Sequence, residues 1–221
     1  FGVKIVLNYK VQDILQEKEN GGFDAVFVAI GAHLAKKVNI PAQEASKILD
    51  AVSFLKDADE NSEDKPLLGR RVAIYGGGNT AMDAARTAKR LGADEAMIIY
   101  RRDREHMPAH EFEADEALSE GVKIHWLSTI KNMETSSITV EKMQVVNGKA
   151  VPTGEYETLE ADSLILALGQ EADTDFLKHI EGITFKEDGT TVEVNPSMMT
   201  GYPGIFAGGD MVPSERTVTI A

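Results

Sequence analysis

The sequence predicts an α/β protein with a Rossmann-like dinucleotide-binding domain. Residues 71–75 (RVAIY) are a short apolar run typical of a buried parallel strand, and they lead directly into a glycine-rich turn at residues 76–81 (GGGNTA). Small apolar residues then recur at helical spacing up to Leu91, and residues 96–100 (AMIIY) predict a second strand. Strand, glycine turn, helix and strand are the context in which a G-x-G-x-x-A turn binds a dinucleotide.

Each residue type in the turn has a physical role. Gly76 permits the tight turn, Gly78 lets the backbone approach a pyrophosphate, and the small Ala81 lets helix and strand pack closely. The free N–H groups and the positive dipole end of the helix would face the phosphates. An ordinary glycine-rich turn is the alternative, but the flanking elements favour binding.

The end of the second strand indicates which dinucleotide is bound. An NAD site places an acidic residue about 20 residues past the glycines, whereas an NADP site places an arginine nearby. Here Arg101 and Arg102 follow the strand, and Arg104 lies close behind. Because guanidinium groups form bidentate bonds with phosphate, we expect NADP(H) rather than NAD(H). A solvated basic loop is the alternative.

Composition excludes several classes of function. The chain has 221 residues, 36 acidic against 23 basic, and a net charge of −13, which argues against a nucleic-acid surface. It has no cysteine, so these residues cannot carry a redox disulfide, an iron–sulfur cluster or a thiolate zinc site. There is no signal peptide and no apolar stretch that predicts a membrane span, so we expect a cytoplasmic location.

The first part of the chain predicts two strands and a short helix. Residues 2–7 indicate a strand, and residues 11–19 a short polar helix or turn. Residues 23–30 (FDAVFVAI) indicate a buried strand that ends at Gly31. A strand that ends in glycine can bring its backbone close to a ligand, although a plain turn is more common.

A charged segment separates this part from the glycine turn. Residues 48–55 (ILDAVSFL) predict a helix, and residues 56–65 (KDADENSEDK) a charged linker. After the second strand of the nucleotide domain, Pro108 is expected to open a helix that runs through Ser119. A third strand is expected at residues 122–127.

After the third strand, the pattern of apolar residues changes from one typical of a parallel sheet to one typical of antiparallel strands. Residues 131–160 include Asn147-Gly148 between apolar residues, a strong hairpin signal, and predict an antiparallel meander. Residues 162–169 (DSLILALG) indicate another buried strand. The apolar run at residues 204–210 delivers Gly209 and Asp210 to its carboxyl end, where open α/β sheets bind ligands, although a plain turn is equally compatible. Residues 217–221 indicate the start of a helix.

Five motifs together resemble the small (β) subunit of glutamate synthase. They are similar also to the wider group of FAD-dependent NADPH oxidoreductases that includes the electron-entry part of dihydropyrimidine dehydrogenase and adrenodoxin reductase. The similarity runs through nearly the whole chain. In chain order the motifs are residues 76–83 (GGGNTAMD), 100–104 (YRRDR), 107–109 (MPA), 167–170 (ALGQ) and 206–210 (FAGGD).

The resemblance implies an NADP(H)-binding domain inserted in an FAD-binding domain, present here as a fragment of a longer polypeptide. Residues 1–36 and 176–221 would be the two parts of a partial FAD-binding domain. Residues 37–68 would be a linker, and residues 69–175 the NADP(H)-binding domain with its β-meander.

The resemblance also assigns cofactor-binding residues. Arg101 and Arg102 would bind the 2′-phosphate, Glu113 would be a further NADP contact, and Gly169 would border the nicotinamide. An exposed helix carboxylate is the alternative for Glu113. Gly31 would mark the hinge-side strand of the FAD domain. Gly209 and Asp210 would meet the ribityl and phosphate region of FAD. The pyrophosphate would lie on Gly76, Gly77, Gly78, Asn79, Thr80 and Ala81.

The chain departs from the family pattern in one respect that matters. The FAD fingerprint, a first strand with G-x-G-x-x-G, is missing, as is the cysteine-rich region for iron–sulfur clusters. We therefore expect the chain alone to bind NADP(H) but not FAD, and to be inactive in isolation. No catalytic residue is expected, because the cofactors supply the chemistry and the histidines are scattered.

The implied function is hydride transfer from NADPH to FAD, followed by electron transfer to an acceptor domain or subunit such as the large subunit of glutamate synthase. Two alternatives stay open. One is a non-catalytic nucleotide-binding module. The other is a pyridine-nucleotide disulfide reductase whose cysteines lie outside this segment.

Overall fold

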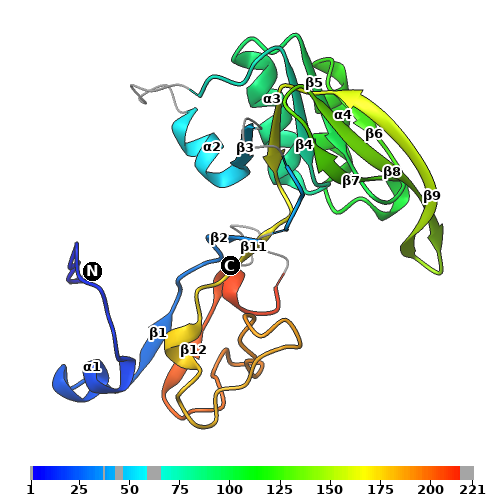
Figure 1. Cartoon of the computed structure of the whole chain (residues 1–221). Coiled ribbons are helices and arrows are strands. Elements are labelled where there is room, and N and C mark those ends of the chain that lie inside the picture. Colours follow the sequence, from blue (N-terminus) through cyan, green and yellow to red (C-terminus); the bar gives the residue numbers. More distant parts are fainter. Residues whose placement is uncertain (1, 37, 43–46, 59–65, 215–221) are drawn as a thin grey trace. The chain divides into compact units, whose positions relative to one another are not determined.

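The computed structural model describes residues 2–36, 38–42, 47–58 and 66–214, and the chain divides into two compact units (Figure 1). One is the sheet unit, Ala35–Gly169. The other, the two-segment unit, combines Phe1–Leu34 with Gln170–Ala221. Each has a hydrophobic core of its own and is described separately.

A five-stranded parallel sheet forms the middle layer of the sheet unit. Its register places Ala73 opposite Leu164 on one side and opposite Met97 on the other. The predicted strands at residues 71–75 and 96–100 are confirmed, with a shift of one residue in the second. In spatial order the strands are β3 (Lys47–Asp50), β10 (Ser163–Leu166), β4 (Arg71–Tyr75), β5 (Glu95–Ile99) and β6 (Lys123–His125).

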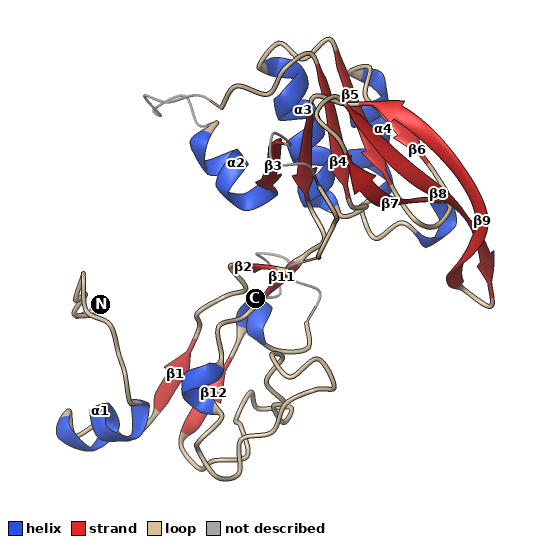
Figure 2. Cartoon of the chain, viewed as in Figure 1, coloured by secondary structure: helices blue, strands red, loops and turns tan. Residues whose placement is uncertain are grey.

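Three helices cover one face of this sheet: α2 (Ala51–Asp57), α3 (Asn79–Arg90) and α4 (Glu111–Ser119) (Figure 2). Buried residues of all three pack with Val72 and Ile74 of β4. The contact face of α3 consists largely of alanines, which let the helix lie close to the strands. Its buried residues are Ala81, Met82, Ala84, Ala85 and Ala88.

An antiparallel meander covers the opposite face. Its strands are β7 (Ser128–Met133), β8 (Ser137–Val146) and β9 (Lys149–Glu160), and side chains from β7 and β8 pack with Ala73 and Tyr75. Asn147 and Gly148, with φ of 52° and 73°, form the two-residue turn of the β8–β9 hairpin. Positive φ at both positions is what a type I′ hairpin turn requires, so the predicted meander and its turn are confirmed.

The two-segment unit contains a parallel strand pair, β1 (Val26–Val28) with β12 (Ile205–Ala207). Helix α1 (Ile14–Asn20) precedes β1, the short helix η2 (Asp175–Leu177) precedes β12, and the short helix η3 (Gly209–Met211) follows β12. Its core includes Ile14, Leu177, Ile205 and Met211. The remaining elements are η1 (Arg104–His106) of the sheet unit and the two-residue strands β2 (Leu34–Ala35) and β11 (Gln170–Glu171).

Several sequence predictions need correction. Residues 2–7 are not a strand, because no described segment pairs with them; Val3 and Leu7 are 79% and 78% exposed. The predicted strand at residues 23–30 shrinks to β1, and Phe27 within it is 62% exposed rather than buried. The helix after Pro108 begins only at Glu111, because residues 107–110 extend over the glycine turn.

The segment from residue 37 to residue 68, expected to be a linker, contains two regular elements. The helix predicted at residues 48–55 is a helix only from Ala51 onward, in α2. The residues before it belong to β3, which is an edge strand of the parallel sheet. Residues 59–65 of the charged segment, and the helix start expected at residues 217–221, lie outside the described residues. In the described ranges, no helix is long and apolar enough to cross a membrane.

Candidate functional site

The glycine turn lies at the carboxyl end of β4, the middle strand of the parallel sheet. Gly76 has φ +152°, and a β-carbon there would lie 2.1 Å from the carbonyl oxygen of Ala167. The N–H group of Gly76 donates to the carbonyl of Ile99 at the end of β5, at 3.1 Å. The turn therefore fits closely between the ends of the two neighbouring strands, as only glycine allows.

The second glycine is held from two sides. A β-carbon at Gly77 would lie 2.4 Å from the ring of Tyr100, and the carbonyl of Gly77 accepts a hydrogen bond from the N–H of Ala109 at 3.0 Å. The side chain of Asn79 accepts another from the N–H of His110, also at 3.0 Å. Residues 107–110 are thereby fastened to the turn.

The third glycine faces open space. Gly78 is the N-cap residue of α3, with φ −92° and ψ 176°, and apart from its chain neighbours no described residue has an atom within 4 Å of where its β-carbon would be. In the part of the chain that the structure describes, no side chain caps the start of this helix. Thr80 lies in the first turn, half-buried. Because the first N–H groups of a helix have no partner within it, this open end fits an anion such as a pyrophosphate.

The two arginines expected to read the 2′-phosphate lie differently. Arg101 is exposed. Arg102 is half-buried: its Nε donates to the hydroxyl of Tyr100 at 3.1 Å, and its guanidinium carbon lies 5.8 Å from the centre of that ring. Both arginines come just after β5, and Tyr100, which directly precedes them, contacts the glycine turn at Gly77.

Other charged groups of the same loop are already paired. Arg104 forms an ion pair with Asp115 at 2.5 Å. The side chain of Asp103 caps η1, and its hydrogen bond with the His106 ring, at 2.5 Å, lowers the pKa of this carboxyl below its ordinary value. Of the three arginines noted in the sequence, Arg101 and Arg102 are thus better placed than Arg104 to meet an anion.

Glu113 is neither exposed nor isolated. Its carboxylate, in the first turn of α4, lies 3.6 Å from the guanidinium of Arg86 on α3, and its side chain is 22% exposed. Arg86 also pairs with Glu116 at 2.9 Å and with Glu120 at 2.7 Å. The hydrogen bond from Arg86 is the main cause that lowers the pKa of Glu120. This cluster joins α3 to α4, so Glu113 has a structural partner in the chain.

Gly169 follows β10 and is exposed, with φ +96°. Its carbonyl accepts a hydrogen bond from the N–H of Lys36 at 3.1 Å. Ala167, two residues earlier, contacts Gly76 as described above. The sheet unit therefore brings Gly169 to the same strand ends as the glycine turn.

The residues assigned to FAD lie in the two-segment unit. Gly31 follows β1, and Gly209 and Asp210 follow β12. Because the two strands are parallel neighbours, all three residues lie beyond the carboxyl end of the strand pair. Gly31 and Gly209 have φ of 66° and 71°. The N–H of Gly208 donates to the carbonyl of Val28 at 3.1 Å, which extends the pairing of the two strands beyond β12.

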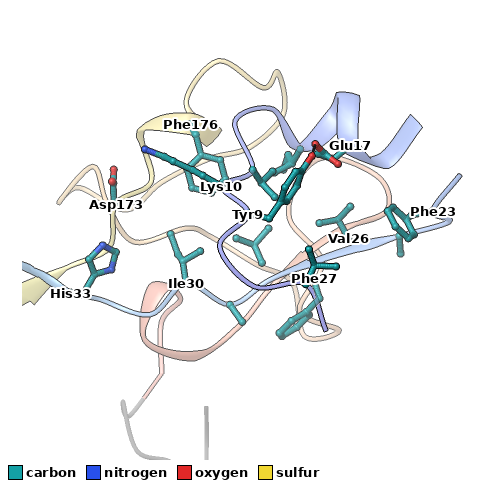
Figure 3. A pocket seen from close by; sticks show the side chains of 16 residues that line it. Tyr9, Lys10, Glu17, Phe23, Val26, Phe27, Ile30, His33, Asp173 and Phe176 are labelled. Carbon is teal, nitrogen blue, oxygen red and sulfur yellow. Dashed lines mark hydrogen bonds between the residues drawn. The ribbon is translucent and has the colours of Figure 1, made fainter. Parts of the chain in front are cut away.

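A largely apolar cavity of about 1060 Å³ also lies in this unit. Figure 3 shows the rings of Phe23 and Phe27 at one end of it, and His33 and Asp173 at the other. Of the described residues, its lining includes neither Gly31 nor Gly209 nor Asp210. The cavity therefore extends to Ile30, next to Gly31, but none of the three residues assigned to FAD lines it.

The contacts of Tyr100 in this site could not be predicted from the sequence. Tyr100 is expected there as the end of a strand and as the first residue of the 100–104 motif, whereas in the structure its ring and hydroxyl connect the glycine turn to Arg102. Sequence reasoning also missed the contact of residues 107–110 with the turn, which depends on where α4 packs.

The parallel sheet, the glycine turn after β4 and the helix that follows it define a Rossmann-type α/β domain. Residues 2–221 match the protein family described as pyridine nucleotide-disulphide oxidoreductase. The chain belongs to this family.

Its relatives include subunits of electron-transfer enzymes. The chain is 37% identical to the β subunit of an NADP(+)-dependent formate dehydrogenase from Moorella thermoacetica, and the match covers 100% of this chain and 33% of that protein. It is 33% identical to a putative NADPH glutamate synthase small chain from Cereibacter sphaeroides, over 100% of this chain and 58% of that protein. The chain thus spans less than two thirds of either relative, and the resemblance to glutamate synthase small subunits is confirmed.

A solved structure shares the fold. Mycobacterium tuberculosis FprA in complex with NADPH superposes with a TM-score of 0.68 at 19% identity, over 93% of this chain and 62% of that chain. The predicted fold class is confirmed.

Proposed function

We propose that this chain is the NADP(H)-binding portion of a flavin-dependent oxidoreductase that passes hydride from NADPH to FAD and electrons onward to a partner. One observation carries the proposal: the glycine turn at the end of β4 leads into an uncapped helix, and Arg101 and Arg102 follow the neighbouring strand. A pyrophosphate would bind the N–H groups at the start of α3. The arginines would bind the 2′-phosphate.

The residues present fit NADP(H). The space over Gly78 is open, whereas the positions over Gly76 and Gly77 are filled by Ala167 and Tyr100. A dinucleotide backbone would therefore approach at Gly78. The nicotinamide, when bound, supplies the hydride; the chain orients it, with Gly169 at its border. Glu113, in the first turn of α4, would be a further contact to NADP(H), and its carboxylate also pairs with Arg86.

The fit to FAD is partial. Gly31, Gly209 and Asp210 offer backbone and one carboxylate at the end of the β1–β12 pair, but the sequence has no second G-x-G-x-x-G turn. We propose that the complete FAD site needs further residues of a longer polypeptide, as the greater length of the relatives suggests. The domain assignment follows: the sheet unit for NADP(H), the two-segment unit for FAD.

The partner is proposed by chemical class. A relative is named as a glutamate synthase small chain and another as a formate dehydrogenase subunit, so we propose an electron-accepting subunit or domain as the partner. That this partner carries iron–sulfur clusters is proposed from the family resemblance of the sequence alone. The chain itself has no cysteine to ligate a cluster or to reduce a disulfide. A cytoplasmic location is proposed on the sequence analysis alone.

Rapid mixing of the full-length flavoprotein with NADPH under anaerobic conditions tests this function. We expect the absorbance of the oxidised flavin to disappear with NADPH, and much more slowly with NADH. A flavin that stays oxidised with both nucleotides would contradict hydride transfer and favour a non-catalytic nucleotide-binding module.

A further inference from the structure

Tyr100 is buried although it carries a hydroxyl group. It follows β5 directly, and its residue surface is only 5% exposed. Its N–H donates to the carbonyl of His125, and its own carbonyl accepts from the N–H of Ser128, both at 3.0 Å. The sheet and its neighbours therefore fix where this side chain starts.

The ring is held between two groups. The position of a β-carbon at Gly77 would be 2.4 Å from the ring, so the glycine turn rests on it. Trp126 meets it edge to face, with ring centres 6.3 Å apart and planes at 80°. The ring has little freedom, and its hydroxyl is correspondingly well placed.

The hydroxyl both donates and accepts. It donates to the carbonyl oxygen of His106 at 2.5 Å and accepts from Nε of Arg102 at 3.1 Å. The guanidinium carbon of Arg102 lies 5.8 Å from the ring centre, within reach of a cation–π interaction. Tyr100 thus contacts Arg102 through its hydroxyl and through its ring.

This contact decides which donors of Arg102 a ligand can use. The Nε–H is occupied by Tyr100, and the donors on the two terminal nitrogens lie outside that contact. These two nitrogens form the end-on fork that pairs with two oxygens of one phosphate. A side chain already held in this orientation loses less freedom on binding.

We propose that Tyr100 is a specificity-determining positioning residue, which holds Arg102 ready for the 2′-phosphate of NADP(H). The inference rests on the proposed function, and it assigns part of the discrimination between NADPH and NADH to a residue that need not touch the nucleotide. The variant Tyr100→Phe tests it, because phenylalanine keeps the ring under Gly77 and removes only the hydroxyl.

The experiment measures the dissociation constants of four ligands by calorimetry: NADPH, NADH, 2′-AMP and 5′-AMP. We expect Tyr100→Phe to weaken NADPH and 2′-AMP by about tenfold, the scale of one hydrogen bond to a charged group, and to change NADH and 5′-AMP by less than about twofold. Tyr202→Phe, in the two-segment unit, is the matched control and should change none of them.

A second pair of variants keeps the test independent of how Tyr100→Phe folds. Arg102→Lys keeps the charge but has no Nε–H, so it should lose NADPH affinity by a similar factor. In an Arg102→Ala background, Tyr100→Phe should cause no further loss, because the two residues act together.

The outcomes separate the two claims. If the unmodified chain binds NADPH no better than NADH, the proposed function fails, and this inference fails with it. If the unmodified chain prefers NADPH but Tyr100→Phe keeps that preference, or weakens both nucleotides equally, Tyr100 has a structural role only and the inference alone is overturned.

Discussion

Gly76 and Ala167 approach each other so closely that a β-carbon on Gly76 would lie 2.1 Å from the carbonyl oxygen of Ala167. The contact joins the glycine turn after β4 to the end of β10. Because backbone meets backbone here, neither side can yield by changing a rotamer.

Gly76→Ala should therefore destabilise the fold. It combines this clash with a φ of +152°, which L-residues rarely adopt. We expect a loss of about 2 to 4 kcal/mol in the free energy of unfolding, measured by urea denaturation. Gly148→Ala is the control, since its φ is also positive but its nearest contact is 3.7 Å away. Equal losses in the two variants would show that the approach to Ala167 contributes nothing.

Gly78→Ala should weaken NADPH binding but leave the stability of the fold nearly unchanged. Its φ of −92° suits alanine, and beyond its chain neighbours no residue in the described ranges has an atom within 4 Å of the position of a β-carbon, so we expect stability to change by no more than about 1 kcal/mol. The added methyl group would occupy the space where a pyrophosphate approaches α3, so NADPH affinity should fall by roughly tenfold or more. Unchanged NADPH binding, measured by calorimetry, would contradict binding at this turn.

Replacing both arginines by alanine should remove the preference for NADPH. Two charge-assisted contacts to one phosphate predict that Arg101→Ala with Arg102→Ala lowers NADPH affinity by roughly a hundredfold and leaves NADH affinity nearly unchanged. The double variant Lys178→Ala with Lys186→Ala removes the same amount of positive charge from the two-segment unit and serves as control. A similar loss in the control would mean that net charge, and not local contacts, sets the affinity.

Stability should decrease as the pH falls through the ordinary histidine range, in part because of His125. Burial lowers the pKa of this half-buried residue below its ordinary value of 6.5. The unfolded chain then takes up a proton at a pH where the folded chain does not, so His125 favours the folded state above that range and ceases to do so below it.

His125→Asn should therefore reduce the stability difference between about pH 7.5 and about pH 5.5, measured as the urea midpoint at each pH. His179→Asn replaces an exposed histidine and should leave the difference unchanged. The idea fails if the two variants behave alike.

The local parts of this fold could be predicted from the sequence. Strand β4, the glycine turn, helix α3 and the Asn147-Gly148 hairpin depend on neighbouring residues, and each has a specific signal. Strand β3 could not be predicted, because it pairs with β10, which lies more than a hundred residues further along the chain. Its sequence, KILD, continues into a helix and follows no strand period.

The candidate site shows the same division. The glycines and the arginine pair are visible as a motif, since spacing alone suggests their chemistry. The contact of Tyr100 with Gly77, and the ion pair between Glu113 and Arg86, depend on how separate elements pack, and a single sequence carries no direct signal for them. Tyr100 and Arg102 are only two residues apart, but their sequence does not specify the side-chain conformations that bring them into contact.

Parallel calorimetric titrations of this chain with NADPH and NADH, at equal ionic strength, test the central claim most directly. We predict clear binding of NADPH and binding of NADH weaker by roughly a hundredfold, since only NADPH carries the 2′-phosphate for Arg101 and Arg102. Equal affinities, or binding of neither nucleotide, would contradict the assignment of the glycine turn and the two arginines as an NADP(H) site.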